Sequence, residues 1–222
     1  MRIDKELITS KPACYIFDID GCIANVDHLI KTNKQVYEIM LEEYNAKVKK
    51  YEEDYAEYRK KSSLNHIDKR LLIEPIHPES PVKPDVKNEN KMNWDYFYNN
   101  VSKAEPIVGC LDVFIALAMT KKVILLTARD EHVRAQTVEW LKKVVMERAG
   151  QDAFRRINFT LIMKESKSSD KETIKYKKET IQNLIKQYNI QLIIEDHPEI
   201  VKEYTKLGLP VLQPNREWIK ID

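Results

Sequence analysis

From Pro106 onward, segments with a helical apolar pattern alternate with short apolar runs that are typical of buried strands. This alternation predicts a mostly parallel sheet whose strands are joined by crossover helices. The expected strands are residues 122–126, 157–163, 191–194 and 209–212, and the expected helices are residues 107–119, 132–146, 172–187 and 198–206. With one further strand at residues 14–19, the sequence predicts a five-stranded α/β fold with three layers.

The strand expected at residues 14–19 runs into the sequence Asp18-Ile19-Asp20-Gly21. Residues two apart on a strand point to the same side, so both aspartates can face one pocket while Ile19 anchors the opposite face. Two carboxylates this close raise one pKa, unless a divalent cation or a shared proton offsets their charge. Gly21 permits a tight turn. Alone, this pattern fits an active site or a strand end whose aspartates cap the next turn.

Chemically reactive residues also follow two other expected strands. Thr127, Ala128 and Arg129 come after the strand at 122–126, and Glu195 and Asp196 come after the strand at 191–194. Ligands of open α/β sheets bind at the carboxyl ends of the strands. Acids and phosphate-binding groups at three such ends therefore indicate a functional site at this edge.

In this order, the residues resemble the motifs of the haloacid dehalogenase superfamily of phosphohydrolases. Asp18 to Gly21 resembles the first motif, Leu126 to Arg129 the second and Ile194 to Asp196 the fourth, and a lysine near the start of the 172–187 helix would be the third. Residues 93–98, 134–141, 161–164 and 212–213 resemble the branch that contains phage polynucleotide kinase phosphatase domains and related phage phosphatases. The resemblance implies a Rossmann-like core.

The resemblance also implies a magnesium-dependent phosphomonoesterase. Asp18 would be the nucleophile that forms an aspartyl-phosphate, and Asp20 would protonate the leaving alkoxide and then activate water. Mg²⁺ would contact the Asp18 carboxylate, the Asp20 backbone carbonyl and the Asp196 carboxylate, with Mn²⁺ or Co²⁺ as substitutes. Glu195 would orient a metal-bound water.

Phosphate-binding roles are implied for several further residues. Thr127 would donate to a phosphoryl oxygen, helped by backbone amides from Ala128 onward, and its alternative role is to cap the next helix. Arg129 would make a bidentate phosphate contact, and its alternative is a surface ion pair. Lys164 lies where polynucleotide phosphatases carry arginine, so it would contact phosphate without the bidentate fork.

The third motif has three candidate lysines, Lys175, Lys177 and Lys178. Alignment of the apolar positions of the helix with the buried positions of the family helix favours Lys177, with Lys178 next. The chosen lysine would neutralise the nucleophile and the phosphate as a point charge. Cys22 replaces the usual threonine of the first motif, and we expect activity to survive this change.

The segment between the first and second motifs exceeds what the core needs, and the resemblance implies a cap over the active site. We expect a core of residues 1–30 and 92–222 and a mainly helical cap of residues 31–91. Apolar and aromatic residues recur every three or four positions from Val36 to Tyr58, which predicts a long amphipathic helix. Its tyrosines would pack against a neighbour or stack on a nucleobase, and packing is favoured. Residues 73–90, with four prolines, would be an extended linker that returns to the core.

A cap favours a small substrate, so nucleoside or deoxynucleoside 5'-monophosphates are the first candidates. A polynucleotide 3'-phosphatase acting on nucleic-acid ends is the nearest alternative, although a net charge of +2 supplies no strong basic stripe. A non-catalytic binding module is the alternative from another class. The joint presence of Asp18, Asp20, Thr127 and Asp196 argues against it.

Composition and the absence of certain motifs limit the expected cellular location and domain content of the protein. The N-terminal sequence lacks an apolar signal core, and no run approaches the roughly 18 apolar residues of a membrane span. We therefore expect a cytoplasmic protein without a membrane partner. The three cysteines have no metal-binding spacing, so we expect buried thiols. No kinase domain is expected, because the chain has no Gly-x-x-x-x-Gly-Lys-[Ser/Thr] loop. The oligomeric state is not predicted.

Overall fold

The computed structural model describes residues 11–64, 72–165 and 170–214. The chain divides into two compact units. We call Met1–Leu29 together with Tyr98–Asp222 the core, and Ile30–Phe97 the arm, which contains the segment expected as a cap. The N-terminal residues 1–10 lie outside the described residues.

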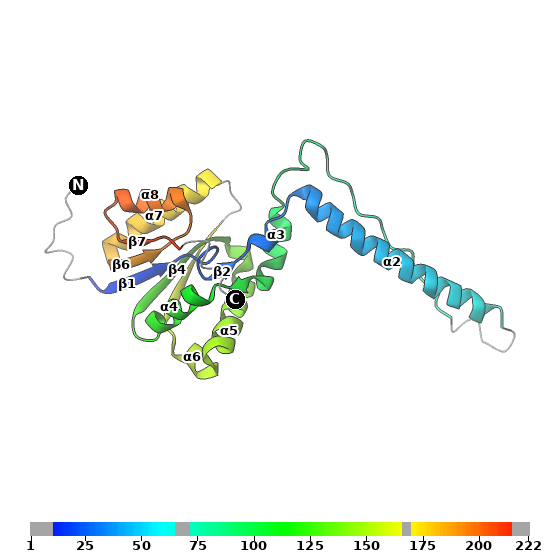
Figure 1. The fold of residues 1–222 in the computed structure, drawn as a ribbon, viewed down its shortest axis with the longest axis horizontal. Coiled ribbons are helices and arrows are strands. Elements are labelled where there is room, and N and C mark those ends of the chain that lie inside the picture. The colour runs from blue at the N-terminus through cyan, green and yellow to red at the C-terminus, as the bar shows by residue number, and fades with distance from the viewer. Residues whose placement is uncertain (1–10, 65–71, 166–169, 215–222) are drawn as a thin grey trace. The chain divides into compact units, whose positions relative to one another are not determined.

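The core contains a parallel sheet of five strands in the order β5-β4-β1-β6-β7 (Figure 1). The strands are β1 (Ala13–Phe17), β4 (Lys122–Asp130), β5 (Phe159–Lys164), β6 (Asn189–Ile194) and β7 (Val211–Leu212). The predicted α/β fold with five parallel strands is therefore confirmed. β1 lies at the centre of the sheet, so the loop that follows it opens between β4 and β6.

Two strands differ from the prediction where the motif residues lie. β1 ends at Phe17, so Asp18 and Asp20 lie in the loop after the strand, and the expectation of an extended strand through Ile19 is wrong. The loop stays attached to the sheet because the Asp18 amide donates to the Ile194 carbonyl at 2.9 Å. β4 instead continues to Asp130, with a shift in its register to β5 after Leu126.

Helices cover both faces of the sheet. Figure 1 shows α7 (Asp170–Gln187) and α8 (Pro198–Lys206) on one face, and α4 (Val108–Ala118), α5 (Arg134–Ala149) and α6 (Gln151–Arg156) on the other. Short 3-10 helices span Asp27–Leu29, Val101–Lys103 and Glu131–Val133, and a small antiparallel pair joins β2 (Ala24–Asn25) to β3 (Glu105–Pro106). α6 was not predicted. It is separated from α5 by Gly150, whose φ is +85°.

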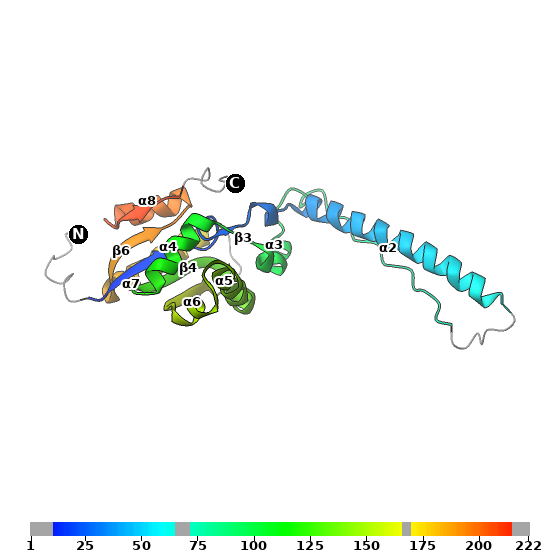
Figure 2. The same cartoon turned by 60° about the horizontal axis from the view of Figure 1, so that its bottom comes forward.

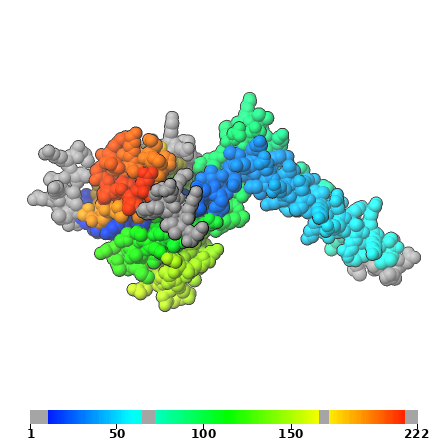
Figure 3. Space-filling view, viewed as in Figure 1, coloured from blue at the N-terminus to red at the C-terminus, as the bar shows by residue number. Residues whose placement is uncertain are grey.

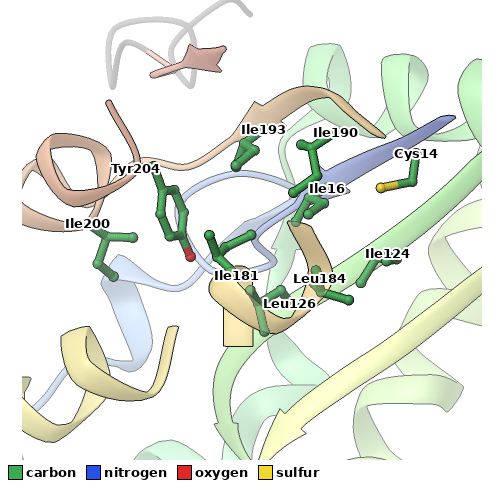
Figure 4. Close-up of a cluster of buried hydrophobic side chains, with 10 residues drawn as sticks. All are labelled: Cys14, Ile16, Ile124, Leu126, Ile181, Leu184, Ile190, Ile193, Ile200 and Tyr204. Atoms are coloured by element: carbon green, nitrogen blue, oxygen red, sulfur yellow. The ribbon is translucent and has the colours of Figure 1, made fainter. Parts of the chain in front are cut away.

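Alternate side chains of β1 serve the two layers of helices. Cys14 and Ile16 belong to a buried cluster with α7 and α8, which Figure 4 shows between the sheet and these helices. Phe17 points to the opposite face, where its ring lies 5.8 Å from that of Phe114 in α4. This period of two is the reason that one strand can support three layers. Cys14, Cys22 and Cys110 are buried free thiols, as expected.

The arm is built on α2 (Asn33–Ser62), a helix of 30 residues. Thr32 caps its start, since the Thr32 hydroxyl accepts from the Gln35 amide and the Gln35 side chain accepts from the Thr32 amide. α3 (Trp94–Asn100) follows at the end of the arm segment. Within the described residues, every helix is too short or too polar to span a lipid bilayer.

The stretch from residue 72 to 90, which we call the return segment, runs back alongside α2 in Figures 1 and 2 and packs against it in the space-filling view of Figure 3. Its residues Pro75, Pro78, Pro81 and Pro84 are half-buried. This period of three matches the three residues per turn of a polyproline II helix. The ring of His77 lies 4.9 Å from that of Tyr51 in α2. The tyrosine stripe therefore packs inside the arm, as favoured from the sequence.

Candidate active site

A buried lysine joins two acids at the carboxyl edge of the sheet. Lys177, in the second turn of α7, donates from Nζ to Asp18 Oδ2 at 2.6 Å and to Glu195 Oε2 at 2.7 Å. The other Asp18 oxygen, Oδ1, accepts from the Ile19 amide at 2.7 Å. The Asp18 carboxylate is therefore held at both oxygens. Asp18 follows β1 and Glu195 follows β6, so their closeness results from the pairing of these two strands.

The remaining candidate lysines of α7 have other partners. Lys178 Nζ lies 2.6 Å from Glu203 in α8, and Lys175 lies 3.9 Å from Glu179 at an exposed position. Lys177 is 1% exposed, whereas the side chain of Lys175 is 74% exposed. Of the three, Lys177 is the one that the structure brings to the carboxylates.

The charges of this cluster do not balance when both of its acids are ionised. Burial disfavours the charge of Lys177, but Asp18 and Glu195 outweigh this effect and raise the pKa of Lys177 well above its usual value. Burial raises the pKa of Asp18 against the opposing effect of Lys177, and burial raises the pKa of Glu195 to about 8. Two buried carboxylates share one ammonium, so the site favours a further cation.

Asp18, Glu195 and Asp196 each place a carboxylate oxygen within 4.8 Å of the others. Hard oxygen ligands of this kind suit Mg²⁺ and similar divalent cations. Gly21, with φ of +77°, makes room for this cluster, because a Cβ at that position would lie 2.1 Å from Asp196 Oδ2. These residues therefore fit a divalent cation. From the sequence, Glu195 was expected to orient a metal-bound water, whereas the structure places its carboxylate within the cluster of possible metal ligands.

The Asp20 carboxylate faces an arginine. Arg129 donates to Asp20 through Nε, at 3.0 and 3.1 Å, and through one terminal nitrogen at 2.6 Å. Its guanidinium also donates to Thr137 Oγ1 at 3.2 Å and lies over the Trp140 ring at 5.5 Å. Arg129 is 1% exposed, so the alternative of a surface ion pair is wrong. Thr137 and Trp140 in α5 hold this guanidinium in place, and this role was not predicted from the sequence.

Thr127, Ala128 and Arg129 lie within β4 near its carboxyl end. Thr127 is fully buried, and its hydroxyl accepts from the Arg129 amide at 3.1 Å. The alternative in which Thr127 caps the next helix is wrong, because Asp130 accepts from the His132 amide and takes that position.

Lys164 is the last residue of β5, and in the strand register it lies opposite Asp130 of the neighbouring strand β4. It is 6% exposed, and its Nζ donates to Thr173 Oγ1 in α7 at 3.0 Å. A cavity of ≈ 440 Å³ opens beside it, lined by residues from the end of β5 and the first turns of α7. These are Ile162, Met163, Lys164, Glu165, Glu172, Lys175, Tyr176 and Glu179.

His132, to which the sequence assigned no role, lies next to Asp130 at the end of β4. His132 Nδ1 lies 2.7 Å from Asp130 Oδ1, and its ring packs edge-on against Tyr98 at 4.9 Å. Burial and the nearby Asp130 and Asp20 raise the pKa of Tyr98 to about 12. The only sequence signal for this arrangement is the spacing of Asp130 and His132, which suits a side-chain turn.

Comparison with known proteins adds the family. Residues 86–217, more than half of the chain, match the family described as the polynucleotide kinase PNKP phosphatase domain. Asp18 and Asp20 precede the matched residues, and the structure brings them to the matched motifs. No curated protein matches the chain.

Among solved structures, the chain is similar to one titled "Structure of Pnkp1/Rnl/Hen1 complex", with a TM-score of 0.51 and 16% identity over 93% of this chain and 47% of that chain. This chain thus spans about half the length of that relative. A haloacid dehalogenase-like hydrolase from Burkholderia xenovorans has a TM-score of 0.45 and 13% identity, over 94% of this chain and 85% of that one. The magnesium-bound HAD-hydrolase YfnB from Bacillus subtilis has a TM-score of 0.46 and 12% identity, over 93% and 90%. On the family match, the chain belongs to the polynucleotide kinase PNKP phosphatase-domain family and is a phosphatase of the haloacid dehalogenase superfamily.

Proposed function

We propose that this phosphatase hydrolyses phosphomonoesters of nucleotides, with Asp18 as the nucleophile and Mg²⁺ as the cofactor. The observation that carries the proposal is the position of Asp18, which is buried at the end of the central strand and held at both oxygens. A fixed, desolvated carboxylate beside an ammonium can attack an anionic phosphate, because the positive charge reduces the repulsion between them.

The reaction would proceed in two displacements. An oxygen of Asp18 would bond to phosphorus while the bond from phosphorus to the nucleotide oxygen breaks, and Asp20 would give that oxygen a proton. A water, deprotonated by Asp20, would then attack phosphorus and release inorganic phosphate, which restores the Asp18 carboxylate. Arg129 supports these steps by fixing the Asp20 carboxylate through three hydrogen bonds.

The phosphate oxygens would be bound by residues from the carboxyl ends of β4 and β5 and from α7. Lys177 would supply charge, and Thr127, the amide of Ala128 and Lys164 would donate hydrogen bonds. Arg129 would act on the phosphate only indirectly, because its buried guanidinium already donates to Asp20 and Thr137. Mg²⁺, held by Asp18, Asp196 and the Asp20 backbone carbonyl with Glu195 close by, would neutralise the phosphate when bound.

Two nucleotide substrates fit this chemistry. The family match favours the 3' phosphate at the end of a polynucleotide. A free nucleoside 5'-monophosphate is the second candidate and rests on the extra segment between the first two motifs. The nucleophile and the phosphate-binding groups would serve both substrates, so the two candidates differ in the size of the leaving group and in whether the phosphate is on the 3' or the 5' oxygen.

Phosphate release from matched substrates tests both levels of the proposal. The panel contains a 3'-phosphorylated oligonucleotide, 3'- and 5'-nucleoside monophosphates and a sugar phosphate, each with Mg²⁺ or with a chelator. Asp18→Asn should abolish release, while Asp152→Asn, an exposed aspartate of α6, should not change it. Release that persists in Asp18→Asn would reject the nucleophile. The preferred substrate decides between nucleic-acid ends and free nucleotides.

A further inference from the structure

The arm is an addition whose two ends meet. A bridge pairs Thr32 with Met92, and the Asn33 amide donates to the Lys91 carbonyl at 2.9 Å. Thr32 and Asn33 lie at the start of α2, while Lys91 and Met92 directly follow the return segment. An insertion of this kind can project a long helix without interrupting the fold on which it is built.

The return segment covers one face of α2 and leaves another face exposed. The covered face carries Tyr44, Val48, Tyr51 and Tyr55, which are half-buried. The exposed face carries a line of residues separated alternately by four and three positions, a spacing that keeps them on one side of a helix. We call this line the outer stripe. It consists of Glu42, Ala46, Lys49, Glu53, Ala56 and Lys60, all exposed.

The outer stripe is complementary to its own reverse. Its members lie nine, five and two residues on either side of Tyr51. A second α2 placed antiparallel, with a two-fold axis at Tyr51, therefore sets Glu42 opposite Lys60 and Lys49 opposite Glu53. The two alanines face each other and allow the helices to approach closely. A parallel copy in the same register would instead place like charges together.

The four charged side chains of the outer stripe are available for such pairing. No ion pair engages Glu42, Lys49, Glu53 or Lys60 within the part of the chain that the structure describes. By contrast, Lys61 forms an ion pair with Glu57 along the helix at 2.5 Å. The order from Lys49 to Glu53 is also the less favourable direction for an ion pair within one helix.

We propose that the arm is a dimerisation element, in which the outer stripe of one copy pairs antiparallel with the outer stripe of a second copy. The interface is isologous, so the two distinct contacts produce four ion pairs around the two-fold axis. Exposed ion pairs contribute modestly and are screened by salt. The dimer is therefore expected to dissociate as the ionic strength rises.

Charge reversal tests the pairing with the full-length chain. The acidic-stripe variant is Lys49→Glu with Lys60→Glu, and the basic-stripe variant is Glu42→Lys with Glu53→Lys. Sedimentation equilibrium at low salt should show a wild-type dimer and, for each variant alone, a dissociation constant raised more than tenfold. An equimolar mixture should recover the dimer, because all four facing pairs again have opposite charges.

The control variant is Lys83→Glu with Lys87→Glu, which makes the same charge change as the acidic-stripe variant but on the return segment, and it should dimerise like the wild type. Helix content by circular dichroism shows whether a variant has lost α2 rather than the contact. A wild-type protein that stays monomeric at low salt overturns the proposal. So does a mixture of two helical variants that fails to dimerise.

Discussion

Lys177 and Asp18 are separated by 159 positions in the sequence, yet Nζ of one lies 2.6 Å from Oδ2 of the other, and both side chains are buried. This contact ties α7 to the end of the central strand. The same ammonium reaches Glu195 after the neighbouring strand, so one side chain fixes the spacing of two strand ends. Nucleophile geometry and local folding therefore depend on one charge.

Replacing Lys177 with methionine should damage both activity and stability. Two buried carboxylates would lose their shared counter-charge, and breaking a buried ion pair in this way costs about 3–5 kcal/mol. We expect kcat/KM for phosphate release to fall by at least about 100-fold, since the charge that aids attack is lost. Urea unfolding and steady-state kinetics measure the two effects.

Lys178→Met is the matched control on the same helix. Its partner Glu203 is partly exposed, so the loss of stability should be far smaller than for Lys177→Met, and kcat/KM should be unchanged. Equal activity in the two variants would show that Lys177 has no role in the reaction.

Gly21→Ala should displace the Asp196 carboxylate from its position beside residue 21. The new Cβ would lie 2.1 Å from Asp196 Oδ2, so the carboxylate must move out of the cluster with Asp18 and Glu195. We expect weaker Mg²⁺ binding by calorimetry and a loss of activity that excess Mg²⁺ only partly restores.

Gly208→Ala separates this clash from the cost of the backbone conformation. Gly208 also has a positive φ, +75°, but nothing lies within 4 Å of its added Cβ. Both variants should lose about 1 kcal/mol of stability from the backbone alone. Only Gly21→Ala should lose Mg²⁺ affinity, and equal affinities in the two variants would contradict the steric argument.

The sequence predicted the core because its buried strands and amphipathic helices keep clear periods, and α8 has the predicted bounds. The pattern failed where the site begins. Thr127 and Arg129 look like a polar loop after a strand, but both are buried within β4. Their burial is stabilised by partners distant in sequence, such as Asp20, 109 positions away, and local patterns do not report such partners.

In the arm, too, local sequence patterns predicted the separate segments but not the contact between them. The spacing of apolar residues predicted the helix of α2, and the prolines predicted an extended segment over residues 73–90. The prediction is wrong for residues 86–90, which form turns in which the Asn88 amide donates to the Asp85 carbonyl at 2.8 Å. α2 and the return segment pack together through half-buried prolines and through the contact of His77 with Tyr51. This packing follows because the three-residue period of the prolines matches the tyrosine stripe of the helix. Such a match can be sought in a sequence only after both segments are expected to be neighbours.

Arg129→Lys should disable the site although the charge is kept. A lysine cannot reproduce the fork that makes three hydrogen bonds to Asp20, nor its stacking over Trp140. We expect a fall in kcat of at least about tenfold. Arg148→Lys is the control, since Arg148 makes a similar two-nitrogen contact to Asp112 at the surface, and its activity should be unchanged. If Arg129→Lys retained full kcat, the fork would be irrelevant to catalysis.

The stability of the metal-free protein should fall as the pH rises from about 4.5 to about 8. Burial raises the pKa of Glu195 from 4.5 to about 8, so the folded state holds a proton that the unfolded state releases across this range. A raised carboxyl pKa thus favours folding at the acidic end of the range, and the benefit is lost as the pH approaches the folded pKa. Mg²⁺ binds the ionised acids, so it should raise the melting temperature more near pH 8 than near pH 5. Melting curves with a chelator or with Mg²⁺ test this, and Glu195→Gln should flatten the decline. A chelated wild-type protein whose melting temperature rises across the range would contradict the assignment.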